Sequence, residues 1–158
     1  MGSTDSADSA DSADSADSGE RRPEFLGVHH VLVGVPPDQK EAAQRYYEDV
    51  IGFVPLASPL ESSGSGNLWW YACGASEFHV SLVPDYRANV RPHVAISVRD
   101  LPALRERLQR HGIETRLDYS YSGCWRIYVV DPWNNRLEFI APLPPGVTAP
   151  PKAPPAAG

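Results

Sequence analysis

Three histidines and one glutamate occupy positions from which their side chains could meet. His30, His79 and His93 each lie in a run of residues typical of a β-strand, and Glu138 lies in a fourth such run. Neutral imidazoles and a carboxylate are ligands that Fe, Mn, Ni, Co and Zn accept in proteins. One histidine on a strand is usually a half-buried residue without chemistry, so the prediction of a divalent-metal site depends on whether all four side chains share a face.

Strand alternation supports a shared face. In residues 29–35 three valines point to one side, which leaves His30 on the other. The apolar neighbours of His79 and of Glu138 likewise point away from these two residues. The polar side chains can therefore face a cleft rather than the core.

The elements that position these residues come in two copies of one order: a strand, a helix and three strands. Asp38 with Glu41 is a capping pair for the first helix and Gly52 ends it, while Asp100 and Gly112 mark the second helix. The first copy is predicted at 29–35, 39–51, 53–57, 68–73 and 77–83, and the second at 92–98, 101–111, 113–119, 125–130 and 136–140.

The repeat makes residues of the two halves equivalent. His30 corresponds to His93, 63 residues later, and aligning the last strands brings His79 onto Glu138. Such repeats usually stack about a pseudo-twofold axis. We therefore expect an α+β fold in which two βαβββ modules place eight mostly antiparallel strands around a cleft, with both helices outside. The same alignment pairs Glu77 with Arg136 and Phe78 with Leu137.

The charge of the chain is concentrated at its N-terminus. Residues 1–20 hold six acidic residues and no Lys or Arg, which accounts for the formal net charge of −6. The remainder is neutral, and phosphate backbones require clustered Lys and Arg, so nucleic acid is not an expected partner.

Two tails are expected to flank one folded domain. An Asp-Ser-Ala repeat cannot bury enough apolar surface to fold, so residues 1–25 are predicted to be disordered. Residues 143–158 form a second, proline-rich tail. The domain is expected at 26–142, with modules at 26–84 and 91–142.

The sequence contains no apolar run that could span a bilayer, and its acidic N-terminus lacks the apolar core of a secretory signal. Cys73 and Cys124 lie 51 residues apart, without the spacing of metal ligands. We expect a cytoplasmic protein with reduced thiols and no membrane contact.

The chain resembles the vicinal oxygen chelate superfamily, which includes glyoxalase I, fosfomycin-resistance enzymes, extradiol dioxygenases and bleomycin-binding proteins. The resemblance covers roughly residues 26–142 and implies a glyoxalase-like eight-stranded cup around a divalent metal held by His30, His93 and Glu138. Most members are dimers, so it also implies a homodimer that acts on a small-molecule substrate. The motifs that carry it are Val28-His29-His30-Val31, residues 46–53 (YYEDVIGF), Pro92-His93-Val94-Ala95 and residues 131–139 (DPWNNRLEF).

Two further positions correspond to residues that particular members of the superfamily use. Glyoxalase I enzymes typically take a fourth ligand, usually a carboxylate, from the strand that here contains His79. Extradiol dioxygenases are similar in having a histidine near His79 and a tyrosine near Tyr128. His79 is therefore expected to be a base or a fourth ligand, and Tyr128 to donate a proton or a hydrogen bond.

Other side chains are candidates for substrate binding. Arg126 shares a strand face with Tyr128 and could hold an anionic substrate, although a surface position is an equal alternative. Trp69, Trp70, Trp125 and Trp133 could form an aromatic wall, with core packing as the alternative.

Three functions agree with these residues. The first is a metal-dependent isomerase or lyase of the glyoxalase type, which chelates two adjacent oxygens of its substrate and stabilises an enolate or alkoxide. The second is an Fe(II) extradiol dioxygenase that cleaves a catechol. The third is a non-catalytic antibiotic-binding protein, whose relatives typically lack the metal triad.

Overall fold

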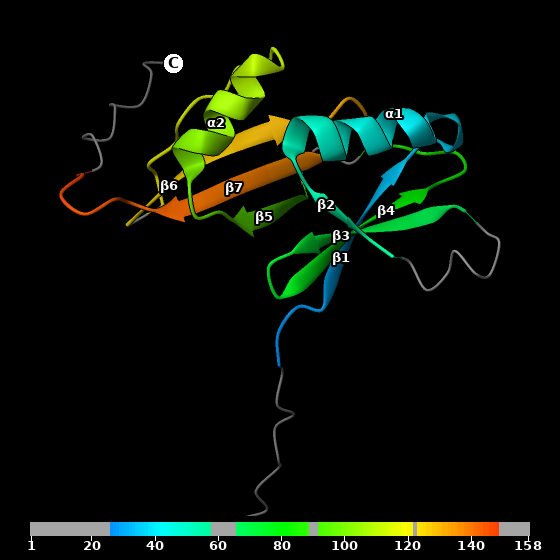
Figure 1. Ribbon diagram of the computed structural model, residues 1–158, viewed down its shortest axis with the longest axis horizontal. Helices are drawn as coiled ribbons and strands as arrows, with labels where there is room; N and C mark the ends of the chain where they lie inside the picture. Colours follow the sequence, from blue (N-terminus) through cyan, green and yellow to red (C-terminus); the bar gives the residue numbers. More distant parts are fainter. Residues whose placement is uncertain (1–25, 58–65, 89–91, 122, 149–158) are drawn as a thin grey trace, which may run out of the picture.

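The two predicted halves lie side by side, each with its own sheet, and both helices cover the same side of the two sheets (Figure 1). This computed structural model describes residues 26–57, 66–88, 92–121 and 123–148. The predictions for residues 1–25 and for the tail beyond 148 lie outside the described residues. Within the described part, no helix is long and apolar enough to cross a membrane.

The first half forms a mixed sheet of four strands in the order β1-β4-β3-β2. Strands β1 and β4 are parallel, and the other neighbours are antiparallel. The elements are β1 (His30–Val35), η1 (Pro37–Gln39), α1 (Lys40–Arg45), η2 (Tyr46–Ile51), β2 (Val54–Leu56), β3 (Leu68–Cys73) and β4 (Ser76–Leu82).

The second half repeats this arrangement with three strands in the order β5-β7-β6, of which β5 and β7 are parallel. Its elements are β5 (His93–Ser97), α2 (Leu101–Arg110), β6 (Cys124–Val130) and β7 (Arg136–Pro142).

The register of the parallel pairs confirms the predicted alignment of the repeat. His30 lies opposite Glu77 in the first sheet, and His93 lies opposite Arg136 in the second. The α+β fold class and the two related modules are thus confirmed.

The predicted strand at 113–119 is wrong. Only Asp118 pairs with β6. Its backbone N–H donates to the Arg126 carbonyl at 2.8 Å, and the Arg126 N–H donates to the Asp118 carbonyl at 2.9 Å. Thr115 instead accepts a hydrogen bond from the Arg105 side chain of α2 at 3.1 Å, so the segment is held to the helix. Alternation predicts the faces of a strand, but a strand also needs a partner along its length. The described residues therefore form seven strands in two sheets, rather than the expected cup of eight.

The first helix begins differently from the prediction. Residues 37–39 form a 3₁₀ turn, and Gln39, rather than Asp38, precedes α1 without a side-chain cap. Proline fixes its own φ near the helical value, so the Pro36-Pro37 pair favours a turn that starts before Asp38 and leaves this carboxylate outside the N-cap position.

The ends of the helices agree with the prediction. Gly52 follows η2 with φ of 93° and Gly112 follows α2 with φ of 76°, a region that glycine adopts without strain. Asp100 caps α2 by accepting a hydrogen bond from the backbone N–H of Ala103 at 2.9 Å.

A single core joins the two halves. Tyr47 of η2 and Leu137 of β7 are both fully buried in it, and Phe78 lies 5.4 Å from the Tyr47 ring. The Tyr47 hydroxyl donates to buried Asp131 of the second half at 2.5 Å. Burial raises the pKa of Asp131, while its hydrogen bonds from Tyr47 and Asn135 oppose that rise. One core and one buried hydrogen bond thus link the two modules.

Candidate metal and substrate site

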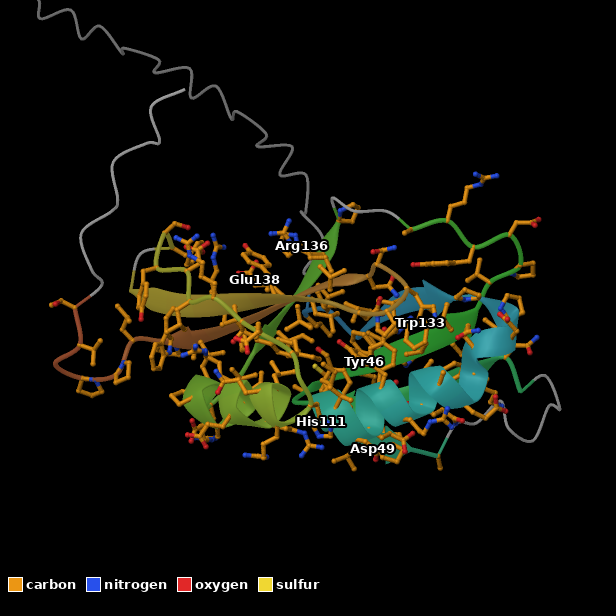
Figure 2. All side chains as sticks on the ribbon, turned by 90° about the horizontal axis from the view of Figure 1, so that it is seen from above. Tyr46, Asp49, His111, Trp133, Arg136 and Glu138 are labelled. Atoms are coloured by element: carbon orange, nitrogen blue, oxygen red, sulfur yellow. The ribbon has the colours of Figure 1, made fainter. Side chains whose placement is uncertain are left out.

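The candidate side chains lie on the face of the sheets that the helices leave open. Figure 2 shows Glu138 and Arg136 on the side away from the helices, whereas Tyr46 and Trp133 lie between helices and sheets. Alternation along β7 places Glu138 on this face and Leu137 in the core, as the sequence predicts. We call this the open face.

Glu138 is the centre of a cluster on the second sheet. Its side chain is only 4% exposed, and both carboxylate oxygens have partners. Oε2 lies 3.0 Å from His93 Nε2, and Oε1 accepts a hydrogen bond from Arg126 Nη1 at 3.1 Å. An imidazole nitrogen and a carboxylate oxygen thus point toward each other from neighbouring strands, with their donor atoms close enough to bind one cation.

Arg126 is already bonded to two carboxylates. Besides Glu138 it lies 3.3 Å from Asp118, and it donates to the Ser120 hydroxyl at 2.9 Å. The pKa of Asp118 is lowered, mainly by the backbone N–H of Ser120 and further by Arg126. A substrate anion at Arg126 would compete with both acids, so this arginine orients Glu138.

Tyr128 lies beside the same cluster. Its ring meets His93 edge to face at 5.8 Å, and the guanidinium carbon of Arg136 lies 4.0 Å from the ring centroid. Desolvation, followed by the nearby Glu138, raises the pKa of Tyr128. The phenol therefore stays protonated at neutral pH and can act as a hydrogen-bond donor.

His79 is held on the first sheet by a stack of rings. It is 4% exposed and lies between Trp70 and His30, with centroid distances of 4.4 and 4.3 Å. Its Nε2 atom lies 2.7 Å from Glu77 Oε2. A carboxylate oxygen accepts at this contact, so His79 donates from Nε2, and Nδ1 is the nitrogen left to accept a proton.

Three of the four predicted tryptophans do not reach the open face, and one of them, Trp133, is buried between the helices and the sheets. Trp69 is buried opposite Val80, and its Nε1–H donates to Tyr71 at 2.8 Å. Trp125 packs against the core opposite Ala141. Trp70 does lie on the open face, because it is the β3 neighbour of His79 and shares its side of the sheet.

The structure brings the four predicted metal-binding residues together as two pairs. His30 and His79 are stacked on the first sheet, and His93 contacts Glu138 on the second. Among the described residues, no group of three His, Cys, Asp or Glu side chains converges to hold a metal ion. The donors thus fit a divalent cation in type, while one chain supplies them in two separate places.

The two pairs are equivalent positions of the repeat. Trp70 lies opposite His79 in the first sheet, as Tyr128 lies opposite Glu138 in the second. Each half therefore presents a histidine from its first strand and a polar side chain from its last strand, next to an aromatic ring.

Comparisons with known proteins agree on the fold. No family profile and no curated protein matches the sequence. Among solved structures, a glyoxalase family protein from Bacillus anthracis is 30% identical, with a TM-score of 0.71, and the match covers 78% of this chain and 100% of that one.

Two more distant structures show the fold alone. Lactoylglutathione lyase from Agrobacterium tumefaciens is 17% identical, with a TM-score of 0.58 and coverage of 75% of this chain and 96% of that one. A genomically encoded fosfomycin resistance protein from Listeria monocytogenes is 12% identical, with a TM-score of 0.54 and coverage of 77% and 96%.

The chain belongs to the glyoxalase family of the vicinal oxygen chelate superfamily. The solved relatives include an enzyme and a resistance protein by name, so membership leaves the reaction open.

Proposed function

We propose that this protein is a divalent-metal-dependent enzyme of the glyoxalase type, an isomerase or lyase that acts on a small substrate with two adjacent oxygens. The observation that carries the proposal is the contact of His93 Nε2 with buried Glu138 Oε2 at 3.0 Å. Burying a carboxylate is costly unless cations or hydrogen bonds compensate it; Arg126 does so at Oε1, and a divalent ion held by His93 and Glu138 would add to that compensation.

The proposal includes a homodimer. The open face of each chain carries half of a ligand set on each sheet, and apolar side chains there are exposed, with Leu32 at 52%. A second copy related by a twofold axis would cover this face and set the first sheet of one chain against the second sheet of the other. His30 of one copy would then join His93 and Glu138 of the other as the three ligands.

When bound, such an ion acts as a Lewis acid toward the two substrate oxygens. The protein's own groups move the proton. His79, oriented by Glu77, accepts it at Nδ1, and Tyr128 donates a hydrogen bond to the oxygen on which charge develops. Arg126 keeps the Glu138 carboxylate in place.

Metal analysis of the full chain, purified without chelator, tests this function. We expect close to one divalent ion per chain, and we expect His30→Ala and Glu138→Ala each to abolish uptake, because each removes one of three ligands. The matched control is His111→Ala, since His111 is exposed at the end of α2 and should leave uptake unchanged.

Other results would point elsewhere. Bound Fe with oxygen-dependent turnover of catechols would favour the extradiol dioxygenase. Absence of metal after loading with Fe, Mn, Ni, Co and Zn would refute the proposed enzyme and leave drug binding as the remaining function. A monomer in sedimentation at micromolar concentration would refute the shared site.

A further inference from the structure

A cavity of about 270 Å³ lies where the two halves meet on the open face. Strand β1 forms one wall with Leu32 and Gly34, and the β5 and β7 strands form the other. The polar side chains that line it are those of Tyr86, Arg87, His93, Asn135 and Arg136.

The lining carries positive charge without a compensating acid. It contains Arg87 and Arg136 but no Asp or Glu. Among the described residues, neither guanidinium forms an ion pair, in contrast to Arg126, which contacts two carboxylates. A pair of uncompensated arginines around a concave space attracts an anion.

The other polar groups of the cavity are already bonded and keep the wall in place. The Tyr86 hydroxyl donates to the Trp133 carbonyl at 2.9 Å, and Asn135 Nδ2 donates to the Gly34 carbonyl at 2.9 Å. A Cβ at Gly34 would come within 2.9 Å of Val83 and 3.1 Å of the Tyr86 ring, so this position has no room for a side chain. The two arginines are thus the groups left to bind a ligand.

The cavity shares one residue, His93, with the proposed metal ligands. The His93 ring lines it, and the same ring contacts Glu138 through Nε2. Arg136 lies opposite His93 in the β5–β7 pair, and its guanidinium lies over the Tyr128 ring. A ligand anchored in the cavity would therefore extend toward the pair formed by His93 and Glu138.

We propose that Arg136 and Arg87 bind an oxyanion of the substrate, a carboxylate or a phosphoryl group, in this cavity. The planar guanidinium fork binds both groups through paired hydrogen bonds. The enzyme would then act on small organic anions whose adjacent oxygens lie beyond the anchored group, an inference that rests on the proposed function.

Anion titration of the full, chelator-treated chain tests this inference without any turnover. Inorganic phosphate and, separately, acetate are added at constant ionic strength while backbone amide signals are followed by NMR. We expect saturable shifts at Gly34, His93 and Asn135. Arg136→Gln and Arg87→Gln should each weaken binding about tenfold or more, since a charge-assisted hydrogen bond is lost.

The matched control is Arg116→Gln, because Arg116 is exposed in the segment after α2 and does not line the cavity. It should bind phosphate as the wild type does. If Arg136→Gln loses its dispersed spectrum, Arg136→Lys keeps the charge without the fork and should still bind more weakly. The tighter of the two anions identifies the group.

The outcomes separate the two proposals. No saturable shift, or unchanged affinity in both glutamine variants, would overturn the anion site. Metal uptake measured on the same variants should be retained, because neither arginine is a proposed ligand. Metal binding without anion binding would refute this inference alone, and anion binding without metal uptake would refute the proposed function alone.

Discussion

At the residue scale, the cluster on the second sheet is a chain of polar and charged side chains in contact. His93 and Arg126 contact the two oxygens of Glu138, and Asp118 lies on the far side of Arg126. Asp118 and Arg126 hold the carboxylate in one orientation, which an ordered metal site requires. The sequence indicated Glu138 and His93 from strand position, but the bond from Arg126 to Asp118 depends on where residues 113–121 run.

The lowered pKa of Asp118 predicts a pH effect. A carboxyl group whose pKa is lower in the folded state stabilises the protein above its unfolded pKa of about 4, and that contribution is lost as the pH falls through the folded value. Asp118→Asn should be less stable than the wild type at pH 6, and the difference should shrink toward pH 3. Thermal unfolding of both proteins across this range measures it. An equal difference at both ends would contradict the assignment.

At the element scale, the starts of the two helices show which part of helix capping a sequence pattern predicts and which part it does not. Both helices have an aspartate near the predicted cap position, and only Asp100 makes the bond. The sequence pattern is the same in kind for Asp38, but two prolines start a turn ahead of it. Capping is decided by backbone geometry over three or four residues, which residue type alone does not specify.

This difference predicts unequal effects of two matched substitutions. Asp100→Ala should lower the free energy of unfolding by about 1 kcal/mol, because the Ala103 N–H loses its partner. Asp38→Ala should change it little, since Asp38 caps no helix in the structure. Urea denaturation of the two variants and the wild type measures both. Equal losses would show that Asp38 caps the first helix after all.

At the scale of the whole molecule, one buried hydrogen bond joins the modules. Tyr47 of the first half donates to Asp131 of the second, and both side chains are buried. The raised pKa of Tyr47, caused by burial and then by Asp131, keeps the phenol protonated. The bond therefore remains in place across the physiological pH range.

Removing this bond should weaken the whole fold. Tyr47→Phe should lower the free energy of unfolding by about 1–3 kcal/mol, because buried Asp131 loses one of its donors. Tyr121→Phe is the matched control, since Tyr121 is 58% exposed and should have little effect. Denaturation followed by tryptophan fluorescence should show one transition in each protein. Two transitions in the wild type would mean that the halves unfold separately.

The sequence by itself determined much of each half: which side chains share a strand face, where the helices end, and how the repeat aligns. Strand alternation is local, because it follows from a period of two residues, whereas the parallel pairs β1–β4 and β5–β7 join strands far apart in sequence. The tertiary structure alone decided that His30 and His79 stay apart from His93 and Glu138, and that Arg126 is bonded while Arg87 and Arg136 face a cavity. These arrangements depend on how the two sheets pack around one core, and contacts between residues far apart in sequence are set by that packing rather than by any local pattern.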